Sequence, residues 1–250
     1  MNTFLEFIGY PGSGKTFYSQ KLKEYLKKKK LRLIKADNYF FDYYSSGIIN
    51  KLIYKNYYQY KKNKKFESKI LFKKQYKYLN NQLDKSIKKN QLKLPIKNFG
   101  DLLDLTDLNK ESKKSALNNF KIDLCTFFLK QRKKKYLIYN DEGLVQKVYQ
   151  SYKNDIKINK LNKEINKYLS SIPIANINII INTNFDKSIK NSEKREKGFK
   201  YNIKGIDETK KKFQLINLII KKNLRNRTKI FIIKNKISLD KQIKGLINYL

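Results

Sequence analysis

The sequence contains no histidine and a single cysteine, Cys125. The absence of histidine removes the most common general base and metal ligand, and it excludes a Ser–His nucleophile. One cysteine excludes an intramolecular disulfide and a cysteine-based zinc cluster, so we expect a reducing compartment. Any acid–base chemistry must therefore be carried by Asp, Glu, Lys or Tyr side chains.

Long apolar runs are also missing from the chain. None approaches the roughly 20 residues that a membrane-spanning helix requires. A cleavable signal has no room before the glycine-rich segment that begins at Gly9. We therefore expect a cytoplasmic protein with no membrane partner.

Negative charge is scarce, and the formal net charge is +37. Such a charge ordinarily indicates a nucleic acid or an acidic membrane surface as partner. However, nearly all of the 58 basic residues are lysines, and Asn, Ile and Tyr are abundant as well. The codons of these residues are rich in A and T, so genome composition explains much of the lysine excess. We interpret the charge as mainly a solvated surface; nucleic acid is a partner that the sequence allows but does not favour.

Glycine and proline are rare, and several of them fall in one octapeptide. This glycine-rich loop consists of Gly9, Tyr10, Pro11, Gly12, Ser13, Gly14, Lys15 and Thr16. It follows a short, mainly apolar run that is typical of a buried strand. Glycines allow the backbone to fold around a polyphosphate with its N–H groups pointing inward. The sequence predicts a nucleotide site in which Lys15 binds the β- and γ-phosphates and the Thr16 hydroxyl binds Mg²⁺.

Five short apolar segments predict strands, and helical patterns separate them, which indicates a parallel, doubly wound α/β sheet. The expected strands cover residues 3–8, 31–35, 136–140, 177–182 and 229–233. With 250 residues and a hydrophobic fraction of 40%, we expect a single domain over residues 1–250.

About a hundred residues separate the second and third expected strands, far more than one crossover needs. Apolar residues at spacings of three and four predict amphipathic helices there. We expect a helical insertion at about residues 43–130, interrupted by a loop over 92–106, where Pro95 and Gly100 break the pattern. Its tyrosines are interpreted as packing residues, with stacking on a base or sugar as the alternative.

Two carboxylates and a glycine, Asp141, Glu142 and Gly143, follow the third expected strand. Beside the glycine-rich loop, Asp141 would reach the metal, and Glu142 would orient a nucleophile or accept its proton. A simple acidic turn is the alternative. Asp37, at the end of the second strand, is expected either to meet an acceptor hydroxyl or to cap the next helix.

A basic segment at about residues 186–205 follows the fourth strand and is expected to form a mobile lid. Arg195 is the best candidate to stabilise the transferring phosphoryl group, because its planar fork fits phosphate and arginine is scarce here. A solvated charged helix is the alternative.

Together, the glycine-rich loop, Asp37, Asp141 with Glu142, and Arg195 resemble the P-loop kinases of the nucleoside and nucleotide kinase group, near thymidylate kinases. The resemblance implies a P-loop NTPase three-layer sandwich with the five strands in the order 2-3-1-4-5. It also implies Mg²⁺-ATP as phosphoryl donor, a helical acceptor-binding region and a closing lid. The C-terminal stretch is similar to the adenine-side ending of that group, which assigns Asn235 to nucleotide binding.

The sequence departs from this family at two positions. The lid usually carries a second arginine where this chain has Asn191. Thymidylate kinases also hold the acceptor phosphate with an arginine after the strand-borne aspartate, where this chain has Glu142. A carboxylate repels a phosphate but suits a hydroxyl, so we expect transfer to a small-molecule alcohol, nucleoside-like or sugar-like.

Several alternatives stay open. A nucleoside monophosphate kinase would use the same donor site, and a P-loop ATPase or GTPase would need a water-positioning residue, for which Glu142 or Gln146 could serve. A polynucleotide 5′-kinase would use the basic insertion to hold a strand end. The sequence leaves the oligomeric state open, a homodimer included.

Overall fold

The computed structural model describes residues 3–29, 31, 33–44, 69–129, 137–140, 142–150, 152–153, 155–195, 206–234 and 238–247. Its centre is a sheet of five parallel strands in the order β2-β3-β1-β4-β5. The strands are β1 (Thr3–Ile8), β2 (Leu33–Lys35), β3 (Leu137–Asn140), β4 (Ile177–Asn182) and β5 (Lys229–Lys234). The predicted α/β class, parallel sheet and strand order are confirmed.

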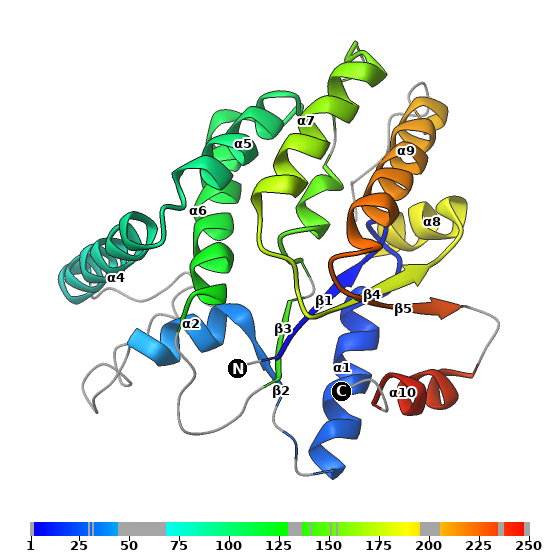
Figure 1. Cartoon of the computed structure of the whole chain (residues 1–250), viewed down its shortest axis with the longest axis horizontal. Helices are drawn as coiled ribbons and strands as arrows, with labels where there is room; N and C mark the ends of the chain where they lie inside the picture. Colours follow the sequence, from blue (N-terminus) through cyan, green and yellow to red (C-terminus); the bar gives the residue numbers. More distant parts are fainter. Residues whose placement is uncertain are drawn as a thin grey trace.

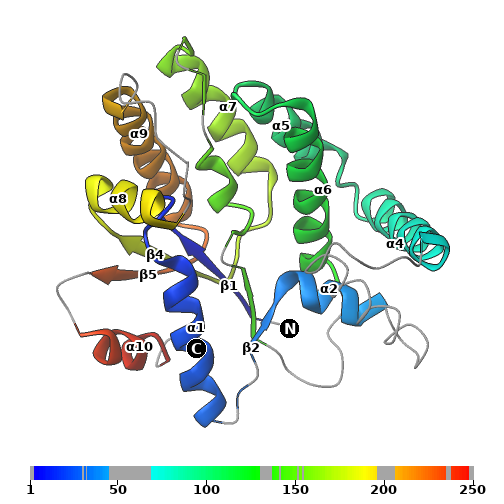
Figure 2. The same ribbon diagram turned by 180° about the vertical axis from the view of Figure 1, so that it is seen from behind.

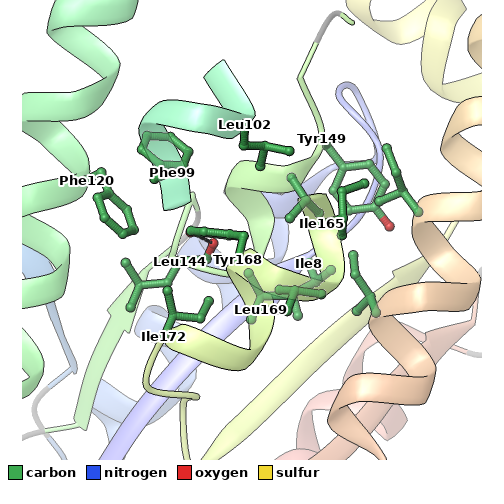
Figure 3. Packing of buried hydrophobic residues seen from close by; sticks show 14 of the residues in the cluster. Ile8, Phe99, Leu102, Phe120, Leu144, Tyr149, Ile165, Tyr168, Leu169 and Ile172 are labelled. Atoms are coloured by element: carbon green, nitrogen blue, oxygen red, sulfur yellow. Dashed lines mark hydrogen bonds between the residues drawn. The ribbon is translucent and has the colours of Figure 1, made fainter. Parts of the chain in front are cut away.

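Helices cover both faces of the sheet (Figures 1 and 2). On one face α1 (Lys15–Lys28) and α10 (Leu239–Ile247) pack against Leu5 and Phe7 of β1. On the other face the larger core joins Ile8 to α7 (Ile158–Ser171) and α9 (Ile206–Leu224), as Figure 3 shows for part of this cluster. Strands buried on both faces read as nearly continuous apolar runs, which explains why the sequence predicted them.

The insertion is helical where the structure describes it. It contains α4 (Lys69–Lys89), α5 (Lys93–Asp104) and α6 (Lys110–Phe127), and α2 (Ala36–Tyr44) precedes it. Residues 45–68 and 130–136 lie outside the described part of the chain. The rings of Phe99 on α5, Phe120 on α6 and Tyr168 on α7 pack together, which joins the insertion to the core.

The prediction of a loop over residues 92–106 is wrong, because α5 occupies most of it. Pro95 lies in the first turn of α5, where its missing N–H costs no intrahelical hydrogen bond. Gly100 destabilises the helix by only about 1 kcal/mol relative to alanine. The buried residues Phe99, Leu102 and Leu103 outweigh that cost through their contacts with the core.

α8 (Phe185–Arg195) forms the first half of the expected lid, and residues 196–205 lie outside the described part. Within the described residues, no helix is both long and apolar enough to cross a membrane.

Candidate functional site

The glycine-rich loop connects the carboxyl end of β1 to the first turn of α1. Gly12 and Gly14 have φ angles of 77° and 96°, in the left-handed region that L-residues with a side chain rarely adopt. The Ser13 N–H donates a hydrogen bond to the Tyr10 carbonyl at 3.0 Å, which closes the turn. The two positive φ angles explain why glycines stand at these positions.

Lys15 begins α1 and lies across this loop. Its Nζ donates hydrogen bonds to the carbonyl oxygens of Gly9 and Tyr10, both at 3.0 Å. The first turn of α1 carries no acidic residue, so the positive end of its dipole is not neutralised by a carboxylate of that turn. Thr16, the next residue, is exposed. An ammonium and a helix N-terminus at one loop form an arrangement that attracts anions.

α8 packs directly on the loop at Gly12. A Cβ at Gly12 would lie 2.1 Å from the Ser188 carbonyl oxygen and 2.5 Å from Ser192 Oγ. Asn191 Nδ2 donates to the Gly12 carbonyl at 3.2 Å, so this side chain of α8 contacts the loop backbone. Position 195 follows one helical turn later on α8; the side chain of Arg195 lies outside the described part.

An aromatic cluster supports the loop from the α9 side. The Tyr10 ring stacks on Phe213 and meets Phe185 and Tyr149 edge to face. Asn217 of α9 joins two of these tyrosines, because its Nδ2 donates to the Tyr10 hydroxyl and its Oδ1 accepts from the Tyr149 hydroxyl. Burial raises the pKa of both hydroxyls, so they act here as neutral hydrogen-bonding groups.

The turn after β3 lies beside the loop, because β3 pairs with β1 and parallel strands end at the same edge. Asp141 lies outside the described residues. The carboxylate of Glu142 is exposed, and its N–H donates to Asn140 Oδ1 at 3.1 Å. Glu142, Lys15 and Thr16 therefore follow neighbouring strands at the same edge of the sheet.

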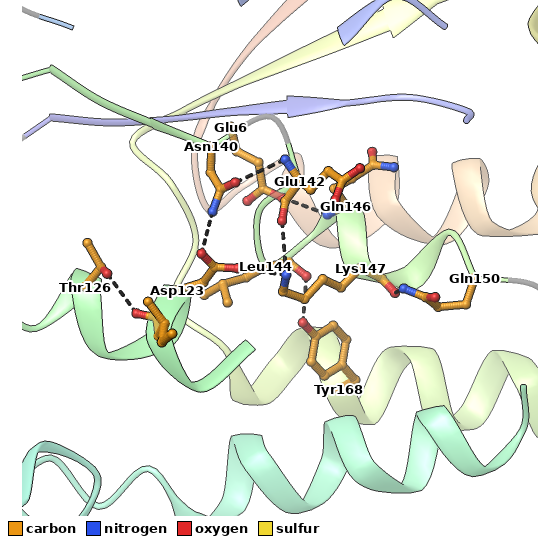
Figure 4. A network of polar contacts seen from close by, with 11 residues as sticks. Glu6, Asp123, Thr126, Asn140, Glu142, Leu144, Gln146, Lys147, Gln150 and Tyr168 are labelled. Atoms are coloured by element: carbon orange, nitrogen blue, oxygen red, sulfur yellow. Dashed lines mark hydrogen bonds and ion pairs between the residues drawn. The ribbon is translucent and has the colours of Figure 1, made fainter. Parts of the chain in front are cut away.

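An ion pair fixes this turn to the insertion (Figure 4). Lys147 Nζ lies 2.7 Å from Asp123 Oδ2 of α6, and each side chain is only 11% exposed. The same ammonium donates to the Glu142 carbonyl at 3.1 Å, and Asn140 Nδ2 donates to Asp123 Oδ1 at 2.9 Å. The positive charge of Lys147 is therefore balanced by the Asp123 carboxylate.

Glu6 is a buried carboxyl group inside β1, with 1% of its surface exposed. Burial raises its pKa to about 8, against a smaller opposing effect of the Gln146 N–H, which donates to Glu6 Oε1 at 2.7 Å. A Cβ at Gly143 would lie 2.4 Å from the Glu6 carboxyl carbon, so any side chain there would have to displace the Glu6 carboxyl group. Sequence reasoning missed Glu6 and Asp123; a lone acid within an apolar run was the one signal for Glu6.

Gln146 lies in the short 3₁₀ helix η1 (Gln146–Val148) and is buried. The Gly9 N–H donates to Gln146 Oε1 at 2.8 Å. The Gln146 side chain thus accepts a hydrogen bond from the glycine-rich loop and is not exposed to solvent.

Two further predicted residues come shortly after strands of the sheet in the sequence. Asp37 lies in the first turn of α2, directly after β2, but its side chain is outside the described part. Asn235 follows β5 and is also outside it. Within the described residues, no group of three or more acidic or cysteine side chains is placed to hold a metal ion.

Comparison with protein-family models gives no match for this chain, and no curated protein sequence matches it.

Proposed function

We propose that this protein is a P-loop kinase that transfers the γ-phosphoryl group of ATP to the hydroxyl of a small molecule. One observation carries the proposal: a loop with two left-handed glycines joins a buried strand to a helix, and the Lys15 ammonium lies across it. Backbone N–H groups, a lysine and a helix N-terminus are the elements that hold polyphosphates. The buried Ser13 hydroxyl, which has no hydrogen-bond partner within the described residues, is a further polar group at this loop.

In this proposal each residue has a distinct role. Lys15 binds the β- and γ-phosphates, and Thr16 with Asp141 holds Mg²⁺, which neutralises phosphate charge when bound. The acceptor oxygen attacks the γ-phosphorus, the bond to the β-phosphate oxygen breaks, and ADP leaves. Asp37 or Glu142 takes the proton of the acceptor hydroxyl. Arg195 stabilises the charge of the transferring group.

The charges around Glu142 favour a hydroxyl acceptor over a phosphate. Glu142 presents a carboxylate, and the nearby Lys147 ammonium is paired with Asp123 at 2.7 Å. An acceptor phosphate near this turn would meet repulsion from Glu142, with Lys147 already neutralised. A nucleoside-like or sugar-like alcohol meets no such penalty.

The buried position of Gln146 also bears on the hydrolase alternative. A water-positioning residue must reach the γ-phosphate, whereas Gln146 Oε1 accepts from Gly9 and its side chain is buried. Of the two residues considered for that role, only Glu142 is exposed. This arrangement removes Gln146 from the water-positioning role and leaves Glu142 as the one candidate for it in a hydrolase. We place the reaction in the cytoplasm, where the buried thiol of Cys125 stays reduced.

The test is ATP consumption by the purified protein with Mg²⁺, alone and with panels of nucleosides, sugars and nucleoside monophosphates. We expect ADP to form only when the correct hydroxyl compound is present. Rapid phosphorylation of dTMP with no hydroxyl compound accepted would contradict the acceptor assignment. Acceptor-independent hydrolysis would favour the ATPase.

A further inference from the structure

Gly9 is held on both sides by side chains from other parts of the site. Its N–H donates to Gln146 Oε1 at 2.8 Å, and its carbonyl accepts from Lys15 Nζ at 3.0 Å. Gly9 is the point at which the chain leaves β1 and enters the glycine-rich loop. The orientation of its two flanking peptide groups therefore sets how the rest of the loop begins.

Gln146 is itself anchored to the same strand. Its backbone N–H donates to Glu6 Oε1 at 2.7 Å, three residues before Gly9 on β1. The Glu6 carboxyl occupies the space that a side chain at position 143 would need, so the turn after β3 lies close against β1. Glu6 and Gln146 thus form a hydrogen-bonded bridge: Glu6 of β1 accepts from the Gln146 backbone in η1, and the Gln146 side chain accepts from Gly9 at the end of β1.

We propose that Gln146 is a positioning residue of the phosphate-binding loop, and that Glu6 anchors it. The inference rests on the proposed function, because it assigns the bridge a purpose in binding the donor phosphates. When a triphosphate draws the Lys15 ammonium from the Gly9 carbonyl, the hydrogen bond from Gly9 to Gln146 remains. That bond keeps the start of the loop from turning its N–H groups away from the ligand. Without it, part of the binding energy would be spent on ordering the loop.

The first measurement is amide hydrogen exchange at Gly9 in the wild type, Gln146→Met and Gln150→Met. Methionine resembles glutamine in length but gives no strong acceptor for the Gly9 N–H. Gln150 is the control, because it lies in the same segment and, within the described part of the chain, its Nε2 donates locally to the Lys147 carbonyl at 3.0 Å. We expect exchange at Gly9 to be about tenfold faster in Gln146→Met, beyond any change at Phe7 within β1, and unchanged in Gln150→Met.

The second measurement is calorimetric titration of the same three proteins with Mg²⁺-ATP. We expect the Kd to rise about tenfold in Gln146→Met and to stay near the wild-type value in Gln150→Met. A general loss of packing would instead lower the unfolding free energy and speed exchange throughout β1, so thermal unfolding of each variant is measured alongside. If Gln146→Met does not fold, Gln146→Asn, whose amide is one methylene shorter, is measured instead.

Unchanged exchange at Gly9 in the variant would overturn the proposal, and so would faster exchange with unaltered affinity for Mg²⁺-ATP. Failure of the proposed function looks different, because the wild type itself would then bind no Mg²⁺-ATP. In that case Gln146 has no role in phosphate binding either. Amide exchange at Gly9 in Gln146→Met then shows only whether Gln146 holds the start of the loop in place.

Discussion

Lys147 of η1 and Asp123 of α6 form a buried ion pair at 2.7 Å that joins the helical insertion to the turn after β3. The pair links a segment inserted between two strands to the edge where we place phosphoryl transfer. Its position makes it a determinant of both stability and site geometry.

Removal of one partner of this pair should destabilise the protein strongly. Lys147→Met removes the ammonium that lies 2.7 Å from the buried Asp123 carboxylate, and we expect the unfolding free energy to fall by about 3 kcal/mol in urea titrations. The control is Lys113→Met, because Lys113 lies 3.4 Å from an Asp104 that is 77% exposed. That loss should be under about 1 kcal/mol. Equal losses in the two variants would show that the Asp123 pair contributes no more than a surface pair.

The pH dependence of stability should report on Glu6. Its pKa is about 8 in the folded protein against 4.5 in an ordinary carboxyl group, so between these values the unfolded chain binds fewer protons. The contribution of Glu6 is therefore complete below about pH 4.5 and is lost as the pH rises to about 8, by an amount on the order of 5 kcal/mol. The charged and titratable groups that face it are Lys147 of η1, Asp123 of α6 and Tyr168 of α7.

Glu6→Gln keeps an acceptor for the Gln146 N–H but cannot ionise. We expect the variant to lose the decline in stability between pH 5 and pH 8 that the wild type shows in urea titrations. A wild type whose stability is flat over this range would refute the raised pKa. Parallel declines in both proteins would assign the effect to another group.

Lys15→Ala should abolish phosphoryl transfer while leaving the fold intact. The ammonium that we assign to the β- and γ-phosphates is lost, and we expect kcat to fall by about three orders of magnitude. Lys23→Ala is the matched control, since Lys23 lies on the same helix and is exposed. Steady-state ADP release checks both, and substantial activity in Lys15→Ala would contradict the proposed site.

Gly12→Ala should move α8 away from the loop. The new methyl group would lie 2.1 Å from the Ser188 carbonyl oxygen, and the φ of 77° is strained for alanine. We expect a loss of more than 1 kcal/mol of unfolding free energy together with weaker binding of Mg²⁺-ATP. At Gly100, on α5, a Cβ would meet nothing within 4 Å, so Gly100→Ala should stabilise the protein by about 0.5 kcal/mol. If the two substitutions behave alike in thermal unfolding, close packing at Gly12 is not what constrains that position.

The central parts of the fold follow from local sequence patterns. Runs such as residues 177–182 are mainly apolar because parallel strands are buried on both faces, and they were recognisable as strands. The helix α5 was not recognisable, because the positions of Pro95 and Gly100 relative to the helix start decide whether they disrupt it. Those positions depend on where the helix begins, which tertiary packing sets.

The glycine-rich loop of the candidate site was the part most readily predicted, because its residues are consecutive. The glycine-rich loop is contiguous, so its spacing carried the prediction. Glu6 and Gln146 are 140 residues apart, and Asp123 comes from the insertion, so no local pattern connects them. Their partnership arises from the strand order, which places β1 next to β3.

That strand order also constrains synthesis of the chain. β1 and β2 are made first and yet never pair, because β3 lies between them in the sheet. During synthesis β1 therefore has no neighbouring strand to pair with until residues 137–140, and then residues 177–182, leave the ribosome. Contacts so distant along the chain form slowly, which leaves early apolar segments exposed to aggregation or to chaperones. A nascent chain halted before β3 would contain every residue of the glycine-rich loop without either neighbouring strand that holds β1 in place.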